Sequence, residues 1–253
     1  MGKQNHAFPF TGRVDTLTFY QTKDGQHMVR KRTRAGGLNT LSPDKYEVAK
    51  ANMAEFSAGA KAGSLLRYAL RQQLTNISDK RLIARVSSQM MKVLKADTLN
   101  ERGKRNIRDG ELNLLQGFDI TAISQFGRVL QVNPITGINR STGKLTVTIP
   151  SFIPKSVNLA RPQGATHFNI VIAGLELDFD RNSENTDIKS TGLLPVDKNP
   201  TGEISIECSV NPDSPLVLFL VAGIEFYSDV NGTVLPLDNG AFTALKVLEV
   251  SKP

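Results

Sequence analysis

The stretch THFNIVIAGLELDFD, residues 166–180, decides the fold class, because its apolar side chains alternate with the period of two that is typical of a β-strand. The alternating residues form two sets: Phe168, Ile170 and Ile172, then Leu175, Leu177 and Phe179. The phase changes at Ala173-Gly174, which predicts a β-bulge at that point.

The sequence around this stretch repeats the same pattern. Further alternating segments are KLTVTIP at 144–150, GEISIECSV at 202–210 and FTALKVLEV at 242–250. Asn231-Gly232 is a strong signal for a tight β-hairpin turn. Short strands separated by turn residues, with no strand–helix–strand alternation, predict an antiparallel β-sandwich over residues 115–253.

Residues 41–114 carry helical signals instead. In LSPDKYEVAKANMAEF, Ser42 is a good N-cap and Pro43 suits the first helical position. An apolar stripe at helical spacing follows, formed by Ala49, Met53, Phe56 and Ala60. Gly59 and Gly63, one turn apart, predict close packing of a second helix, and a simple break of the helix at Gly59 is the alternative.

That second helix is expected to begin at Ser78, with Asp79 in its first turn. Its predicted buried face consists of Leu82, Val86, Met90 or Met91, Val93 and Leu94. The polar segment NERGKRNIRDGE, residues 100–111, is expected to be a loop that leads out of the helical region.

The N-terminal segment, residues 1–40, is expected to be an arm with a β-hairpin over 12–34 and a turn at Lys23-Asp24-Gly25. Its returning strand runs into GQHMVRKRTRAGG, residues 25–37, which is dense in cations. A two-stranded ribbon is marginal alone, so it must lie on the rest of the chain or on another chain. Taken together, the chain is predicted to be α+β, with an N-terminal β-ribbon and a helical region followed by an antiparallel β-sandwich.

Charge is distributed unevenly along the 253 residues. Residues 1–110 hold 21 Lys and Arg against 9 Asp and Glu, a net charge of +12, whereas residues 111–253 hold 10 against 15, a net charge of −5. The basic half can face nucleic-acid phosphates, or it can face the acidic half of a neighbouring copy in a head-to-tail contact.

The sequence contains no convincing catalytic set, and we expect neither an enzyme nor a cofactor. AGAKAGS lacks the Lys-Ser/Thr pair of a phosphate-binding loop. Of the three histidines, His167 is expected to be structural, and Cys208 is expected to be an inert core residue. A Cys–His dyad is the alternative, but nothing in the spacing of these residues calls for it.

The acidic run DFDRNSENTD, residues 178–187, admits two interpretations. Its alternate oxygen-bearing residues, Asp178 to Glu184, suit a hard-cation loop. However, Ser183 replaces the expected glycine and Lys189 replaces the expected glutamate, so a solvated strand-to-loop segment is the simpler interpretation.

The location of the chain is predicted from absences in the sequence. A single cysteine and the lack of an apolar signal-peptide segment favour folding in the cytoplasm. The longest apolar run, residues 215–227, is shorter than the roughly 20 residues of a membrane helix, so no membrane span is expected.

The segments GRVDTLTFYQTKDGQHMVRKR, NMAEFSAGAKAGSLLRYALR, ATHFNIVIAG and GIEFYSDVNGTVLPLDNGAFTAL resemble a family of uncharacterised Bacteroidota proteins. The resemblance spans most of the chain and implies a bacterial origin, but it implies no activity or site residue. The ribbon and its basic segment also resemble, in architecture alone, the extended arms of phage-like structural proteins.

These observations lead to the hypothesis of a structural protein that self-assembles as a filament, tube or shell by docking its arm on a neighbouring subunit. The candidate contact residues are Phe19, Tyr20, Arg30, Lys31, Arg32 and Arg34. The alternative is a nucleic-acid-associated packaging or coating protein. A carbohydrate-binding sandwich ranks third, because the chain has no Trp.

Overall fold

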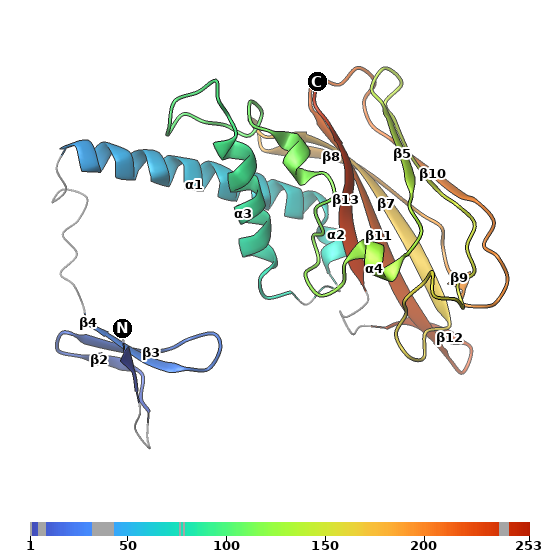
Figure 1. Ribbon diagram of the computed structural model, residues 1–253, viewed down its shortest axis with the longest axis horizontal. Helices are drawn as coiled ribbons and strands as arrows, with labels where there is room; N and C mark the ends of the chain where they lie inside the picture. The colour runs from blue at the N-terminus through green and yellow to red at the C-terminus, as the bar shows by residue number, and fades with distance from the viewer. Residues whose placement is uncertain (1, 5–8, 32–42, 76, 78, 238–242) are drawn as a thin grey trace. The chain divides into compact units, whose positions relative to one another are not determined.

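The computed structural model describes residues 2–4, 9–31, 43–75, 77, 79–237 and 243–253. It has the predicted mixed α+β composition, with a β-rich C-terminal part (Figure 1). The chain divides into two compact units, residues 1–50 and residues 51–253, which are described separately.

The N-terminal unit contains a four-stranded antiparallel sheet in the order β1-β4-β3-β2. Its strands are β1 (Gly2–Lys3), β2 (Gly12–Val14), β3 (Leu17–Gln21) and β4 (His27–Lys31). The predicted hairpin is β3 and β4, and Gly25 has the positive φ of 80° that its turn requires. The prediction of a two-stranded ribbon is incomplete. The chain turns at Asp15, which has a positive φ of 48°, so that β2 pairs with β3, and β1 adds a fourth strand beside β4.

The larger unit is built on a six-stranded antiparallel sheet, in which β11 pairs with β7 along eleven residues. Its strands are β7 (His167–Asp178), β8 (Ser183–Ser190), β9 (Leu194–Pro195), β11 (Val217–Val230), β12 (Thr233–Pro236) and β13 (Ala244–Ser251). Neighbouring strands follow the order β12-β11-β7-β8, while β13 also pairs with β11 and β9 with β7.

A second, three-stranded sheet packs on one face of the larger sheet and completes the predicted sandwich. Its order is β10-β6-β5, formed by Ile204–Ser209, Lys144–Ile149 and Ile135–Asn139. The shared core contains Leu145 and Val147 of β6 against Ile170 and Ile172 of β7, with α4 (Phe126–Val129) at its edge.

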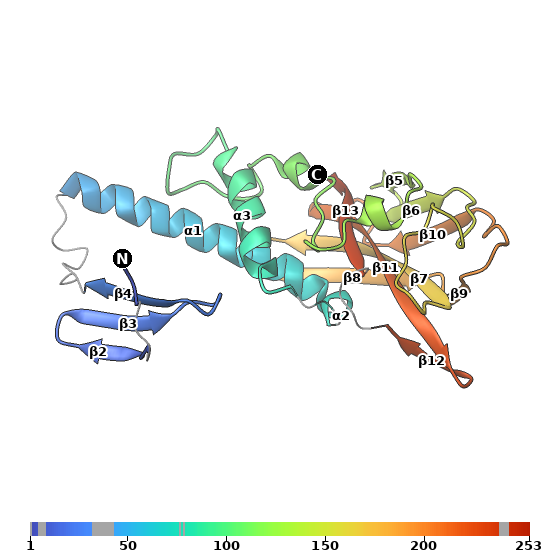
Figure 2. The ribbon, with the colours of Figure 1, turned by 60° about the horizontal axis from the view of Figure 1, so that its bottom comes forward.

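Helices cover the opposite face of the larger sheet, so three layers form, as Figures 1 and 2 show. The helices are α1 (Pro43–Ala69), α2 (Arg71–Leu74), α3 (Leu82–Lys95) and the 3₁₀ turn η2 (Leu112–Leu115). Leu66 of α1 and Met90 of α3 belong to one hydrophobic cluster with Leu175 and Phe219 of the sheet. The helical region and the sandwich, which read as successive segments in the sequence, therefore share a core.

Covering β7 on both faces explains the phase change in residues 166–180. Ile170 and Ile172 point to the three-stranded sheet, whereas Ala173, Leu175 and Leu177 point to the helices. Pairing of β7 with β11 is continuous, so the predicted bulge at Ala173-Gly174 is wrong. The register shift of this sheet lies instead where β11 meets β13, between Leu220 and Val221.

The packing predicted from Gly59 and Gly63 is confirmed. A Cβ built on Gly59 would lie 2.5 Å from Met91 Sδ, and one on Gly63 would lie 3.3 Å from Ser87 Oγ, both on α3. The expected buried face of α3 is confirmed for Val86, Met90, Val93 and Leu94, while Leu82 is half-buried against the same core. The expected start of α3 is not confirmed, because α3 begins at Leu82, and Asp79 instead caps the preceding turn by accepting a hydrogen bond from the Arg81 backbone N–H. Ser42 and Ser78 lie outside the described residues.

Candidate interaction surfaces

The register of the N-terminal sheet determines which side chains share a face. Directly opposed residues of an antiparallel pair point to the same side. The pairs Val14↔Leu17 and Phe19↔Val29 therefore lie on one face, and the Phe10 ring packs against Phe19 with ring centroids 4.3 Å apart. These five residues are called the apolar face below.

The other side of the sheet differs in character and is called the cationic face. It consists of Lys3, Arg13, Thr18, Tyr20, Met28 and Arg30, by the pairs Arg13↔Thr18, Thr18↔Arg30, Tyr20↔Met28 and Lys3↔Met28. The Arg30 guanidinium lies over the Tyr20 ring, 5.5 Å from its centroid.

The sheet divides the contact residues that the sequence grouped together. Phe19 and Lys31 lie on the side of the apolar face, and Tyr20 and Arg30 lie on the cationic face. Arg32 and Arg34 lie outside the described residues. The sequence identified Phe19 but missed its neighbours on the apolar face, because the strand break at Asp15 that brings Val14 beside Leu17 has no clear signal in RVDTLTFY.

The apolar face has no covering layer within its own unit. None of the described residues of the unit is buried, and Val14 and Leu17 are exposed. A sheet with one apolar face normally packs that face against a second layer. The described part of the unit supplies no such layer.

A second uncovered apolar surface lies on α1. Met53 is 59% exposed and Phe56 is 65% exposed, although the sequence places both on a stripe that suits burial. Glu55, Gly59 and Ala62 lie on the buried side of this helix instead. Glu55 contacts the loop that follows α3, and the lack of a side chain at Gly59 lets α3 pack closely. Met53 and Phe56, with Ala60 one turn further along, are called the α1 stripe below.

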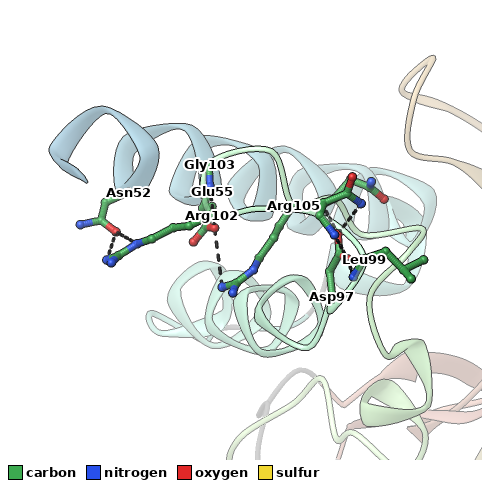
Figure 3. A network of polar contacts seen from close by, with 9 residues as sticks. Asn52, Glu55, Asp97, Leu99, Arg102, Gly103 and Arg105 are labelled. Carbon is green, nitrogen blue, oxygen red and sulfur yellow. Dashed lines mark hydrogen bonds and ion pairs between the residues drawn. The ribbon is translucent and has the colours of Figure 1, made fainter. Parts of the chain in front are cut away.

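The basic loop after α3, which contains residues 100–111, is bound to α1 by a polar network, which Figure 3 shows. Arg102 Nη2 donates to Asn52 Oδ1 at 2.6 Å, and the Gly103 backbone N–H donates to the buried Glu55 carboxylate at 2.9 Å. Arg105 lies 3.8 Å from the same carboxylate. Arg102 and Arg105 therefore help to hold the loop on α1.

Asp97 organises the start of this loop. It is buried, and its carboxylate accepts backbone N–H groups from Leu99, Asn100 and Asn106, together with the Asn100 side-chain amide. Burial alone would raise the pKa of the Asp97 carboxyl, but these hydrogen bonds outweigh it and lower the pKa to about 2. The role of Asp97 is thus to hold the loop.

The acidic run at 178–187 is paired within the chain. Its ion pairs are Arg181–Asp178, Arg108–Asp180, Arg71–Glu184 and Lys189–Asp187, at 4.0, 3.8, 3.0 and 3.3 Å. Among the residues that the structure describes, no group of three or more His, Cys, Asp or Glu is placed to hold a metal ion. Two of these pairs join the basic helical region to the sandwich, so part of the charge asymmetry is neutralised inside one molecule.

The remaining candidates for a catalytic role, His167 and Cys208, lie on different strands, β7 and β10. His167 Nδ1 lies 3.0 Å from Thr166 Oγ1 at the start of β7. Cys208 is buried, and burial raises the pKa of its thiol to about 11, as expected for an inert core cysteine. Residues 156–165 line most of an open depression of about 650 Å³. Arg161 is the cation of this lining, but its Nη1 atom already donates hydrogen bonds to the backbone carbonyls of Pro154, Ser156 and Leu159.

No helix in the described part of the chain combines the length and the apolar character needed to cross a membrane. Comparisons of the chain with family models, with curated proteins and with solved structures return no match.

Proposed function

We propose that the protein is a non-enzymatic structural subunit that assembles with copies of itself through its N-terminal sheet. The observation that carries this proposal is the apolar face, which no described residue of its own unit covers, with Phe19 at its centre and Phe10 packed on it. Completely burying a side chain of this kind is worth about 1.5–3 kcal/mol, so a partner that covers the face gains a substantial driving force.

The receiving surface in this proposal is the α1 stripe of a neighbouring copy. Met53 and Phe56 present large exposed side chains on one side of a helix, and a sheet face packs well on such a ridge. Because several carboxylates of the sandwich are already paired within the chain, the contact is proposed to depend on apolar burial rather than on the opposed charges of the two halves.

The symmetry of the assembly follows from the two surfaces. A contact between a sheet on one copy and a helix on the next joins two different patches, so it is heterologous. An open assembly of such subunits then keeps one free sheet at one end and one free helix at the other. A ring, tube or filament is the expected product, rather than a closed two-fold dimer.

Disulfide trapping between two kinds of chain tests the proposal. One chain carries Leu17→Cys on the apolar face, and the other carries Phe56→Cys on the α1 stripe. The buried Cys208 thiol, with its raised pKa, contributes little background at neutral pH. Mixing and mild oxidation are expected to give a cross-linked pair of chains.

Thr18→Cys is the matched control, because it lies one residue further along β3 and points to the opposite face. It is expected to cross-link poorly with the same partner. The proposal is wrong if Leu17→Cys and Thr18→Cys cross-link equally, or if a single chain with Leu17→Cys and Phe56→Cys closes only on itself at every protein concentration.

Light scattering gives an independent measurement. Phe19→Ser is expected to lower the average mass of the concentrated protein. The helical circular dichroism signal of the full-length chain, which comes from α1, α2 and α3, is expected to stay unchanged. A wild-type chain that remains monomeric at high concentration overturns the proposal.

A further inference from the structure

The cationic face of the N-terminal sheet is distinct from the surface proposed for assembly. Arg13, Thr18 and Arg30 form one row across β2, β3 and β4, and Tyr20, Met28 and Lys3 form the next row across β3, β4 and β1. The three cations lie on β1, β4 and β2, and the two edge strands of the sheet are three inter-strand gaps of about 4.8 Å apart, so the cations are spread over roughly 14 Å of one surface.

The charge of this face is uncompensated. Lys3, Arg13 and Arg30 are exposed, and none of them is in an ion pair among the residues that the structure describes. The face itself carries no carboxylate, since Asp15 and Asp24 lie in the turns. Residues 1–50 hold nine Lys and Arg against four Asp and Glu.

Several cations of the larger unit are used differently. Arg71, Arg85 and Arg108 in the larger unit each contact a carboxylate of the same chain. The fold thus accounts for those charges, but it does not account for three like charges gathered on one face of a small sheet. Like charges brought together repel, so the arrangement favours a polyanionic ligand.

The aromatic residue of this face narrows the class of polyanion. The Tyr20 ring and the Arg30 guanidinium stack on each other, with 5.5 Å between the guanidinium carbon and the ring centroid. Such a pair presents a planar platform next to cations, which suits a nucleobase beside its phosphates. An anionic membrane would instead favour several large apolar side chains next to the cations. On this sheet Met28 is the one such side chain among the described residues of the cationic face, and the others lie on the opposite face.

We propose that the cationic face binds single-stranded nucleic acid, with Lys3, Arg13 and Arg30 contacting phosphates and the Tyr20–Arg30 pair stacking on a base. The two faces of the sheet allow this contact and subunit assembly at the same time. The proposal therefore does not depend on the proposed function.

A fluorescently labelled mixed-sequence DNA strand of about 20 nucleotides is the probe, and anisotropy of the full-length chain at several salt concentrations is the measurement. Three phosphate contacts predict a slope of about −2 in log binding constant against log salt. Arg30→Gln is expected to weaken binding at low salt about tenfold and to make the slope shallower by about 0.7.

The matched control is Lys31→Gln, which removes the same charge from the next residue of β4 but from the other face. It is expected to leave affinity within about twofold. Tyr20→Ala keeps all the charges and is expected to weaken binding about tenfold with an unchanged salt slope. Circular dichroism and the assembly state of each variant are measured alongside, so that loss of folding is separated from loss of the site.

Four results would overturn the proposal. They are no binding at low salt, equal losses for Arg30→Gln and Lys31→Gln, tighter binding to a duplex of the same length than to the single strand, and displacement of the strand by phosphatidylserine vesicles at lower concentration than by unlabelled strand. An assembly-defective Phe19→Ser chain that still binds the strand would separate this site from the assembly contact.

Discussion

The backbone N–H of Asn106 donates to the Asp97 carboxylate at 3.1 Å, and this bond joins the end of α3 to the far side of the basic loop. Four hydrogen bonds from three residues meet on this one carboxylate. We therefore expect the conformation of the loop to depend on Asp97 remaining ionised.

Stability is therefore expected to depend on pH through Asp97. The folded-state pKa of about 2 lies below the usual value near 3.9, so the contribution of Asp97 is fully present above about pH 4 and is lost as the pH falls toward 2. Urea unfolding should show a large stability difference between wild type and Asp97→Asn at pH 7 and a smaller one at pH 2.5. Glu101→Gln, at an exposed carboxylate of the same loop, should show little difference at either pH.

Gly110 should tolerate no side chain. A Cβ at this position would collide with the backbone carbonyl of Val93, a group that cannot move without disturbing the end of α3. Gly110→Ala is expected to destabilise the protein by about 1–3 kcal/mol in urea unfolding. Gly127→Ala, where a Cβ meets nothing within 4 Å, is the control and should be close to neutral. Equal effects at the two glycines would contradict the close approach.

Cys208 should be unreactive in the folded protein. Its thiol is buried and its pKa of about 11 leaves almost no thiolate at pH 8. Reaction with a chromogenic disulfide reagent is expected to be at least a hundredfold slower in the native state than in urea. Fast native labelling would mean that the contact between β10 and the larger sheet opens readily.

Calcium should leave the stability unchanged. The carboxylates of residues 178–187 are paired with Arg and Lys side chains of the same chain, and those cations would have to be displaced. Thermal unfolding in millimolar Ca²⁺ and in excess chelator is expected to give the same Tm. A rise in Tm with Ca²⁺ would show that the acidic run binds the ion.

Several elements could be predicted from the residue types of a few neighbouring positions. Asn231 and Gly232 have φ values of 54° and 85°, the positive pair that a type I′ hairpin requires, and this requirement can be read from the two residue types alone. The buried face of α3 is likewise a matter of helical periodicity. Such features need only a few neighbouring residues, and for that reason they were predictable.

Features that depend on distant segments were not predictable in the same way. The phase change in residues 166–180 resembles a bulge in the sequence, because the sequence does not say that helices cover one face of β7 and strands cover the other. Met53 and Phe56 have the correct spacing for burial, but periodicity does not identify what packs on them. The two faces of the N-terminal sheet required the register, which depends on the turn at Asp15.

The order of the three layers has a consequence during synthesis. The C-terminal residue of α3 is Lys95, but its packing partner β11 begins only at Val217, more than a hundred residues later. At roughly 5–20 residues per second, the apolar side of the helices waits for about 6–25 s before the central strand leaves the ribosome. We therefore expect the nascent chain to be shielded during that interval by a chaperone or by transient contacts of its own.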